Sequence, residues 1–496
     1  MNGYHGPVSR RPNIVFVQSD QQRWDALGAV SPLVRTPHLD ALAARGTLHE
    51  QAVCQVPICM PSRYSTLLGL YGFQAGTRHN TQMIPDDGEL PVPTLAMRLK
   101  ALGYRTACFG KTHWYEGEPF FPGDFPLKPS RRGFDHVSTI RRTPLDPADV
   151  TMEDELPDAC AALAVERRAY GGGGEDPAGY AGSTSAVPAD RHDAGWLTAK
   201  ACAWLDGRRS AADPFFLYLT FNCPHPGFGV PAGYEARYNL DTIPDRPRPP
   251  WPVLAQPPGH VGPPRRWREA WERMDARERR RTTLRYWALC TYVDDCVGRI
   301  LAAVSAAGEA ERTLVVYTSD HGEMLGDRGH RFSKYCLYEG AVRVPLILAG
   351  PGVPSGRRDT RPCELVDLMP TLLAAVGAPA EAGPPGLNLL ADGRRDGSFA
   401  EYHGSGYEAA RAAPSWMWRT PEWKLILSAR GGGMRGELYD LKADPGEWTN
   451  RFDDAACAAV RRALTERLIF HLGQAGADWP PNPEGRGWTE EGNPDD

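Results

Sequence analysis

The sequence lacks the apolar stretches that membrane insertion or secretion would require. None of its 496 residues belongs to an uninterrupted apolar run of about 18 residues, the minimum for a transmembrane helix. The polar segment 1–12 also has no apolar core of the kind found in secretory signals. A formal net charge of only -5 gives no support to nucleic-acid binding. We therefore expect a cytoplasmic protein whose partners include neither a membrane nor a nucleic acid.

Cysteine is present, but it lacks the spacing of a disulfide framework or of a zinc site. The 11 cysteines are scattered along the chain, and no Cys-x-x-Cys pair occurs among them. An odd number without regular spacing favours reduced thiols over a disulfide scaffold. The missing pairs also argue against a structural zinc site. Internal repeats are absent as well, which excludes a repeat array.

Apolar runs alternate with amphipathic segments along most of the chain. The runs at 13–20, 105–109, 214–220 and 313–320 are apolar on both faces, which is typical of buried parallel strands. Segments such as 193–205 and 282–303 carry apolar side chains at helical spacing. Strands that alternate with helices predict an α/β fold built on a parallel sheet.

A connector rich in Gly, Pro and Ala at 377–386 predicts a domain boundary. We expect residues 1–385 to form the larger domain, with loop-rich insertions near 116–195 and 226–265. Residues 386–496 then form a smaller domain. Its short strand-like runs, terminal helical segment and loose proline- and acid-rich tail predict an α+β fold.

Polar side chains stand at the carboxyl ends of the predicted strands. They are Asp20 with Gln21, Lys111 with His113, His225, and Asp320 with His321. Strand ends of this kind meet at one edge of a parallel sheet, where ligands bind. Carboxylate, amide and imidazole groups together suit a divalent cation such as calcium, magnesium or manganese. Taken singly, each has a structural reading too, such as a helix cap for Asp20.

The pentapeptide Cys59-Met60-Pro61-Ser62-Arg63 lies between a predicted strand and a helix expected over 64–70. By itself it is compatible with an ordinary buried thiol, because free cysteine is among the most buried residue types. A position just before a helix N-terminus, however, favours negative charge. Arg63, Lys111 and Lys334 would supply positive charge to the oxygens of a sulfate or phosphate ester.

This pentapeptide resembles the signature of the type I sulfatases of the alkaline-phosphatase superfamily. The first matching block runs from Asn13 through Arg63 and Gly69, and further blocks lie at 103–113, 224–226 and 313–350, with a weaker one at 437–447. The resemblance implies a large mixed, mostly parallel sheet sandwiched by helices, followed by a smaller C-terminal α+β domain. It also implies that a maturation enzyme oxidises Cys59 to formylglycine, an aldehyde that hydrates to a geminal diol.

The same resemblance implies a role for each matching position. Asp20, Gln21, Asp320 and His321 would hold one divalent metal, together with an oxygen of the modified Cys59. Arg63 would fix the diol, Lys111 would contact substrate oxygens, and His113 would lie near the diol. His225 and Lys334 would face the oxygen of the leaving group. One diol hydroxyl then attacks sulfur, and the sulfated diol collapses to the aldehyde with release of sulfate.

Two positions depart from the commonest arylsulfatase pattern. Gln21 stands where many members have a second aspartate, and His321 stands where many have an asparagine. These choices resemble the choline-sulfatase and phosphonate-monoester-hydrolase branches. Gln21 lowers the negative charge of the site by one unit. We expect calcium as the metal, with manganese or magnesium as alternatives.

The function predicted from these residues is hydrolysis of a small-molecule or glycan sulfate ester. The identity of the ester and any homo-oligomeric state are left open by the sequence. Hydrolysis of a phosphonate monoester or phosphodiester at the same site is the first alternative, because the tetrahedral geometry of the anion is shared. The second is a catalytically silent binding protein in which Cys59 stays unmodified.

Overall fold

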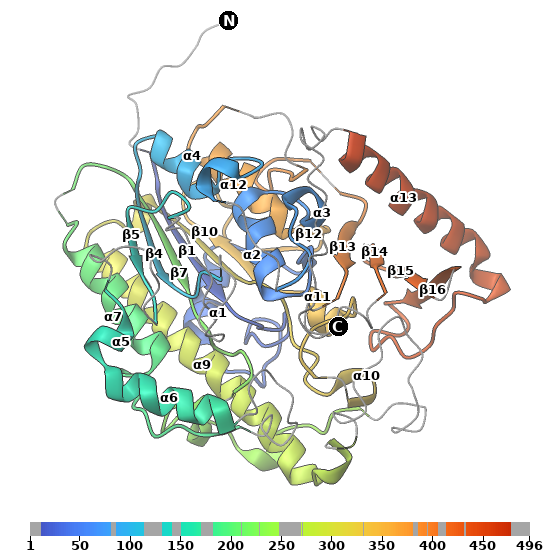
Figure 1. The fold of residues 1–496 in the computed structure, drawn as a ribbon, viewed down its shortest axis with the longest axis horizontal. Helices are drawn as coiled ribbons and strands as arrows, with labels where there is room; N and C mark the ends of the chain where they lie inside the picture. The colour runs from blue at the N-terminus through green and yellow to red at the C-terminus, as the bar shows by residue number, and fades with distance from the viewer. Residues whose placement is uncertain are drawn as a thin grey trace, which may run out of the picture.

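A computed structural model describes most of the chain (Figure 1). The described residues are 11–80, 86–113, 131–140, 150–169, 182–209, 211–227, 229–247, 269, 271–330, 332–379, 385–393, 395–404, 413–430 and 433–477. Among their helices, none combines the length and the hydrophobicity that crossing a membrane requires. All 11 cysteines lie in the described part and are free thiols.

The larger part of the protein is built on an eight-stranded sheet. Its strands, from one edge to the other, are β11 (Arg357–Asp359), β2 (Thr47–His49), β10 (Leu346–Ala349), β9 (Thr313–Ser319), β1 (Asn13–Ser19), β7 (Phe215–Thr220), β4 (Arg105–Gly110) and β5 (His136–Ser138). Only β10 runs antiparallel to its neighbours, β9 and β2. The other pairs are parallel. The prediction of a large mixed, mostly parallel sheet is therefore confirmed.

The central strand β1 shows why apolar runs indicated a buried sheet. Val15 and Val17 point into one apolar core, and Ile14 and Phe16 point into the other. Side chains alternate between the two faces of a strand, so a strand covered on both faces must be apolar throughout.

Helices cover both faces of this sheet (Figure 1). The core that contains Val15 is closed by α1 (Pro37–Ala44), α7 (Asp193–Asp206) and α9 (Ala276–Ala306). The core that contains Phe16 is closed by α2 (Cys59–Leu68), α4 (Leu95–Ala101) and α12 (Leu368–Ala375). Further α-helices of this part are α3 (Gly72–Ala75), α5 (Met152–Glu155), α6 (Pro157–Ala169), α10 (Asp327–His330) and α11 (Glu339–Val342). Two small sheets of two strands each pair β3 (Ala52–Val53) with β12 (Cys363–Glu364) and β6 (Ser183–Thr184) with β8 (Gly229–Val230).

A second sheet follows in the C-terminal part. It is an antiparallel meander of β13 (Ser398–Tyr402), β14 (Ser415–Arg419), β15 (Trp423–Arg430) and β16 (Gly433–Asp440). The helix α13 (Ala458–Ala477) packs on one face of it (Figure 1). Leu464 and Leu468 of this helix belong to the same apolar core as Leu425 and Leu438 of the sheet. This agrees with the predicted α+β fold of the C-terminal part.

The predicted domain boundary adjoins residues 380–384, which lie outside the described residues, and it stays a prediction. The described part of the first predicted insertion, 116–195, contains the edge strand β5 of the large sheet, the strand β6 and the helices α5 and α6, as well as loops. In the second predicted insertion, near 226–265, the proline-dense residues from 248 onward lie outside the described residues.

Candidate active site

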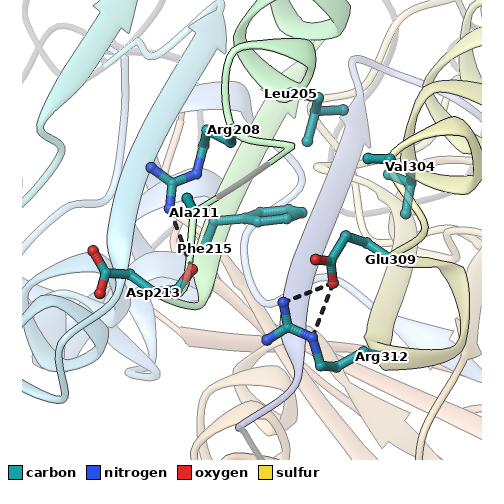
Figure 2. A pocket seen from close by; sticks show the side chains of 9 residues that line it. Leu205, Arg208, Ala211, Asp213, Phe215, Val304, Glu309 and Arg312 are labelled. Atoms are coloured by element: carbon teal, nitrogen blue, oxygen red, sulfur yellow. Dashed lines mark hydrogen bonds and ion pairs between the residues drawn. The ribbon is translucent and has the colours of Figure 1, made fainter.

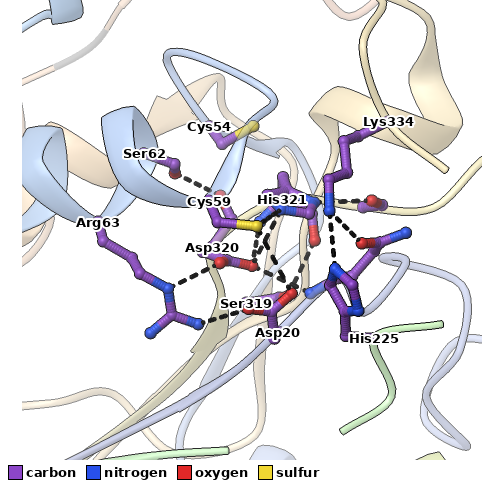
Figure 3. Close-up of polar contacts among 12 residues, drawn as sticks. Asp20, Cys54, Cys59, Ser62, Arg63, His225, Ser319, Asp320, His321 and Lys334 are labelled. Carbon is purple, nitrogen blue, oxygen red and sulfur yellow. Dashed lines mark hydrogen bonds and ion pairs between the residues drawn. The ribbon is translucent and has the colours of Figure 1, made fainter. Parts of the chain in front are cut away.

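The parallel strands bring the predicted polar residues to one edge of the large sheet (Figure 3). In the register of the sheet, Ser19 pairs with Ser319, so Asp20 and Asp320 follow adjacent strand ends. Gln18 and Gly110 both pair with Thr220, which places Lys111 and the segment leading to His225 at the same edge.

Cys59 is the first residue of α2, so the helix begins five residues earlier than the predicted start at Tyr64. The sequence prediction was wrong here because Pro61 is tolerated in a first turn, whose backbone N–H groups have no partner within the helix. The thiol sulfur lies 3.2 Å from Nε2 of His321 and 3.9 Å from Oδ1 of Asp20. The N-terminus of α2 therefore directs Cys59 into the cluster of strand-end residues.

The surroundings of the thiol stabilise negative charge. Burial alone raises the pKa of Cys59, but Lys111, Lys334 and His321 outweigh it and hold this pKa well below its usual range. The N-terminal end of the helix dipole acts in the same direction. Surroundings that favour a thiolate at this position also favour any other anionic group bound there.

Arg63 ties three strand ends together. Its Nε donates to Oδ2 of Asp320 at 2.9 Å, and its Nη2 donates to Oδ2 of Asp20 at 3.0 Å. Its Nη1 donates to the carbonyl oxygen of Lys111 at 3.0 Å. The guanidinium is fully buried. Its planar fork therefore fixes the spacing of the two carboxylates, and each of them keeps Oδ1 turned away from Arg63.

Four of the predicted metal-binding residues form a compact donor group. One ligand atom each of Asp20, Cys59, Asp320 and His321 lies within 4.8 Å of all the others, and all four residues are buried. Nδ1 of His321 lies 3.0 Å from the carbonyl oxygen of Gly322, which directs Nε2 towards the group. Burial, and next the charge of Asp20, raise the pKa of Asp320. A divalent cation would relieve this crowding of carboxylates, so the donor set fits a hard to borderline metal.

Gln21 directly follows Asp20 of this donor group. Its backbone is left-handed, with φ 67°. The side-chain Nε2 donates to Oε2 of Glu323, and Oε1 accepts a hydrogen bond from Nζ of Lys334 at 2.7 Å. The amide oxygen has a second lone pair that could face a cation. The assignment of Gln21 as a ligand stays a prediction.

Glu323 is a site residue that the sequence pattern did not reveal. It is fully buried, and its Oε1 accepts hydrogen bonds from the backbone N–H groups of Leu325 and Ser333. Its Oε2 accepts a hydrogen bond from Nε2 of Gln21. The carboxylate therefore sets the orientation of the Gln21 amide. The only sequence signal was its place two residues after His321, and no local pattern indicates the partner of a loop carboxylate.

His225 and Lys334 form a pair on the opposite side of the thiol from Arg63 (Figure 3). Nζ of Lys334 lies 3.0 Å from Nε2 of His225, and Nδ1 of His225 lies 3.0 Å from the carbonyl oxygen of Pro226. Burial, and next the charge of Lys334, lower the pKa of His225 to about 4. Burial also opposes the charge on Lys334, but neighbouring anionic groups, Cys59 foremost, raise its pKa. At neutral pH the ammonium of Lys334 thus donates to an uncharged imidazole.

Lys111 and His113 complete the cluster at the end of β4. Nζ of Lys111 donates to Oδ2 of Asp20. His113 has a left-handed backbone, φ 52°, and it is buried. Burial lowers the pKa of His113 more than its hydrogen bond with Cys59 raises it. An uncharged imidazole beside the thiol position can accept a proton there.

A hollow elsewhere in the protein has no connection with this cluster. It lies where β7 and β9 begin, at the edge of the sheet opposite the candidate site, and it is lined by Leu205, Phe215 and Val304 (Figure 2). An ion pair between Glu309 and Arg312 borders it at 2.7 Å. None of the predicted site residues lines this hollow.

Comparisons with known proteins match nearly the whole chain. The family described as Sulfatase matches residues 12–378, and the family described as N-sulphoglucosamine sulphohydrolase, C-terminal matches residues 326–473. The chain is 27% identical over 471 residues to the uncharacterized sulfatase YidJ of Escherichia coli (strain K12), covering 93% of this chain and 87% of that protein. It is 27% identical over 476 residues to arylsulfatase K of Rattus norvegicus, covering 89% and 75% respectively. Among solved structures, phosphonate monoester hydrolase SpPMH from Silicibacter pomeroyi superposes with a TM-score of 0.74 at 24% identity, over 94% of this chain and 96% of that one.

Proposed function

The chain belongs to the sulfatase family of sulfuric ester hydrolases, and from this premise we propose that it cleaves a sulfate ester to an alcohol and inorganic sulfate through Cys59 converted to formylglycine. The observation that carries the proposal is the position of Cys59. It stands at a helix N-terminus, between His321 and Asp20, in buried surroundings that stabilise negative charge. A structural thiol would need none of these charged neighbours.

The modified residue would supply the nucleophile. Formed and hydrated, this residue would supply one hydroxyl for attack on sulfur, and loss of the proton of its second hydroxyl would return the aldehyde as the bond to the sulfate oxygen breaks. Lys111 stabilises the negative charge that gathers at this position, and Arg63 keeps the two carboxylates in place. The uncharged imidazole of His113 accepts the proton of the second hydroxyl.

A divalent metal would be held by Asp20, Gln21, Asp320 and His321, together with an oxygen of the modified Cys59. When bound, it would neutralise the charge of the ester oxygens and so favour attack by an oxygen nucleophile. We propose calcium, because two carboxylates dominate the donor set.

The leaving alcohol must gain a proton as its bond to sulfur breaks. Lys334 holds a proton on Nζ, and His225 presents Nε2 as the acceptor that keeps this ammonium in place. We assign proton donation to this pair, with Lys334 as the residue that holds the proton at neutral pH.

Substitution of the pair should therefore affect poor leaving groups most. We expect Lys334→Ala to lower kcat for an alkyl sulfate by about 10²–10⁴-fold, the usual contribution of general acid catalysis. Turnover of nitrophenyl sulfate should fall far less, because its leaving oxygen needs little protonation. Steady-state rates on both substrates measure the contrast.

His225→Ala provides the companion measurement. The same selective loss, smaller in size, is expected if His225 orients the ammonium of Lys334. An equal loss on both substrates in both variants would show that the pair only shapes the pocket, and would remove it from the role of acid.

Hydrolysis of a phosphonate monoester is the second candidate activity. It is compatible with the neutral amide of Gln21, whose oxygen accepts a hydrogen bond from Lys334 and adds no negative charge to the site. The fold shared with phosphonate monoester hydrolase SpPMH is compatible with it. Both esters present a tetrahedral monoanion, so the charge of the site does not separate them.

Parallel rate measurements on matched phenyl esters decide between the two activities. We expect kcat/KM for the sulfate monoester to exceed that for the phosphonate monoester, with inorganic sulfate released in step with the phenol. A larger kcat/KM for the phosphonate would assign the site to the alternative.

A further inference from the structure

The segment that carries Lys334 has an unusual backbone. Between β9 and α11 it adopts left-handed conformations at four non-glycine residues: Leu325, Arg328, Ser333 and Tyr335, with φ between 46° and 68°. Left-handed backbone is sparsely populated outside glycine, so such a cluster persists only where surrounding contacts enforce it. Lys334 lies within this cluster and is almost fully buried.

Contacts within the catalytic cluster account for one end of the segment. Glu323 accepts the N–H of Ser333, and Nζ of Lys334 reaches Gln21 and His225. The backbone that follows Lys334, over 335–339, also has partners in the C-terminal part of the chain.

Lys424 of β15 holds this part of the backbone from the C-terminal sheet. Its Nζ donates to the carbonyl oxygen of Leu337 at 3.1 Å, three residues after Lys334. The same ammonium makes ion pairs with Glu339 at 2.7 Å and Glu447 at 2.8 Å. The side chain is fully buried, so this ammonium has exchanged water for these three partners.

The residues of the C-terminal block 437–447 meet the same segment. The hydroxyl of Tyr338 donates to Oε2 of Glu437 at 2.9 Å, and so does the hydroxyl of Tyr439 at 2.6 Å. The guanidinium of Arg328 lies over the Tyr338 ring, 4.0 Å from its centre. Glu447 accepts the N–H of Glu339 at 2.8 Å. The block is therefore a set of side chains that face the Lys334 segment.

The contact between the C-terminal sheet and the Lys334 segment depends on the charge of Glu339 and of the cations around it. Burial would raise the pKa of Glu339, but Arg419, Lys424 and Arg343 outweigh it and hold this pKa well below its usual range. Removing one cation leaves a buried carboxylate less compensated, which strongly favours rearrangement of the backbone around it.

We infer that Lys424 is a positioning residue for Lys334: by fixing Leu337 and Glu339 against the C-terminal sheet, it keeps the ammonium of Lys334 at His225 and Gln21. The inference rests on the proposed function, in which Lys334 delivers the proton to the leaving group. It gives the C-terminal sheet a part in the reaction through the segment that carries Lys334.

The test compares Lys424→Met with a neighbour on the same strand. Leu425 is also fully buried, but its side chain points to the opposite face of β15, into the core under α13. We expect Lys424→Met to lower kcat for an alkyl sulfate by about 10–100-fold, the scale of a displaced catalytic group. The loss on nitrophenyl sulfate should be much smaller, as for Lys334→Ala. Leu425→Ala should lower both rates by one common factor.

Hydrogen exchange of peptides covering 333–339 supplies a readout that does not depend on activity. Exchange there should rise in Lys424→Met and stay unchanged in Leu425→Ala. Tyr338→Phe removes a single hydroxyl and should shift exchange and leaving-group selectivity in the same direction, which keeps the inference testable if Lys424→Met does not fold. Equal losses on both substrates, or unchanged exchange in both variants, would overturn the inference. If Lys334→Ala itself shows no leaving-group selectivity, the proposed acid is wrong, and the exchange data still decide whether Lys424 holds the segment.

Discussion

Cys59→Ala should abolish turnover of sulfate esters while the protein keeps its fold. The substitution removes the residue from which the nucleophile is made, so we expect the rate to fall by about 10⁴-fold or more. Stability should change little, because the thiol lies among polar groups and belongs to none of the apolar cores. Steady-state rates on nitrophenyl sulfate and a thermal melt measure the two effects.

Cys54 offers a matched control for this substitution. It is fully buried close to the same cluster, where its thiol contacts the carbonyl oxygen of Ala341 at 3.8 Å (Figure 3). Cys54→Ala therefore removes the same atoms nearby without touching the proposed nucleophile. It should retain turnover, and loss of activity in both variants would point to packing as the common cause.

Mass spectrometry of the peptide that contains Cys59 tests the chemistry directly. Active protein should show an aldehyde in place of the thiol, and aldehyde-reactive probes should label that peptide alone. Full turnover by protein with an unmodified Cys59 would remove formylglycine from the mechanism. Unmodified thiol together with tight binding of sulfate esters and no turnover would favour the silent binding protein.

Asp320→Asn should remove the metal and the activity together. The substitution keeps the shape of the side chain but deletes one of two carboxylates that crowd the donor group. We expect bound calcium to fall from about one per chain to near zero, because hard cations depend on carboxylate charge. The rate should fall by about 10²–10³-fold or more, the scale of one lost electrostatic stabiliser. Elemental analysis and rates with added calcium measure both.

Asp294 provides the matched control for the metal. It is also a fully buried carboxylate and belongs to another group of possible ligands, with His38 and Asp295. Its oxygens accept the N–H groups of His38 and Leu39 at the start of α1, which is an ordinary structural task. Asp294→Asn should keep both metal and activity. Retention of the metal by Asp320→Asn, or its loss in Asp294→Asn, would show that the ligands were assigned wrongly.

The sequence by itself determined the class of fold and which polar strand ends meet at one edge of the large sheet. An apolar run such as 13–20 is buried on both faces whatever surrounds it, and strands of this kind must pair within one sheet. The parallel order then brings Asp20, Lys111 and Asp320 to one edge. These inferences held because periodicity and strand ends are local properties, and a few neighbouring residues suffice to express them.

The tertiary structure alone decided the partners of the buried charges. Sequence places Arg63 after the cysteine, but only packing shows that it bridges two carboxylates and the Lys111 carbonyl group. The sequence likewise does not indicate that Glu323 accepts a hydrogen bond from the Gln21 amide, or that Lys424 donates to the carbonyl oxygen of Leu337, 87 residues away. Such contacts join segments that are far apart in the chain, and a buried charge accepts any suitable partner that the fold presents. The sequence therefore identified the charged residues of the site, whereas the partner of each one depended on the packing of the whole chain.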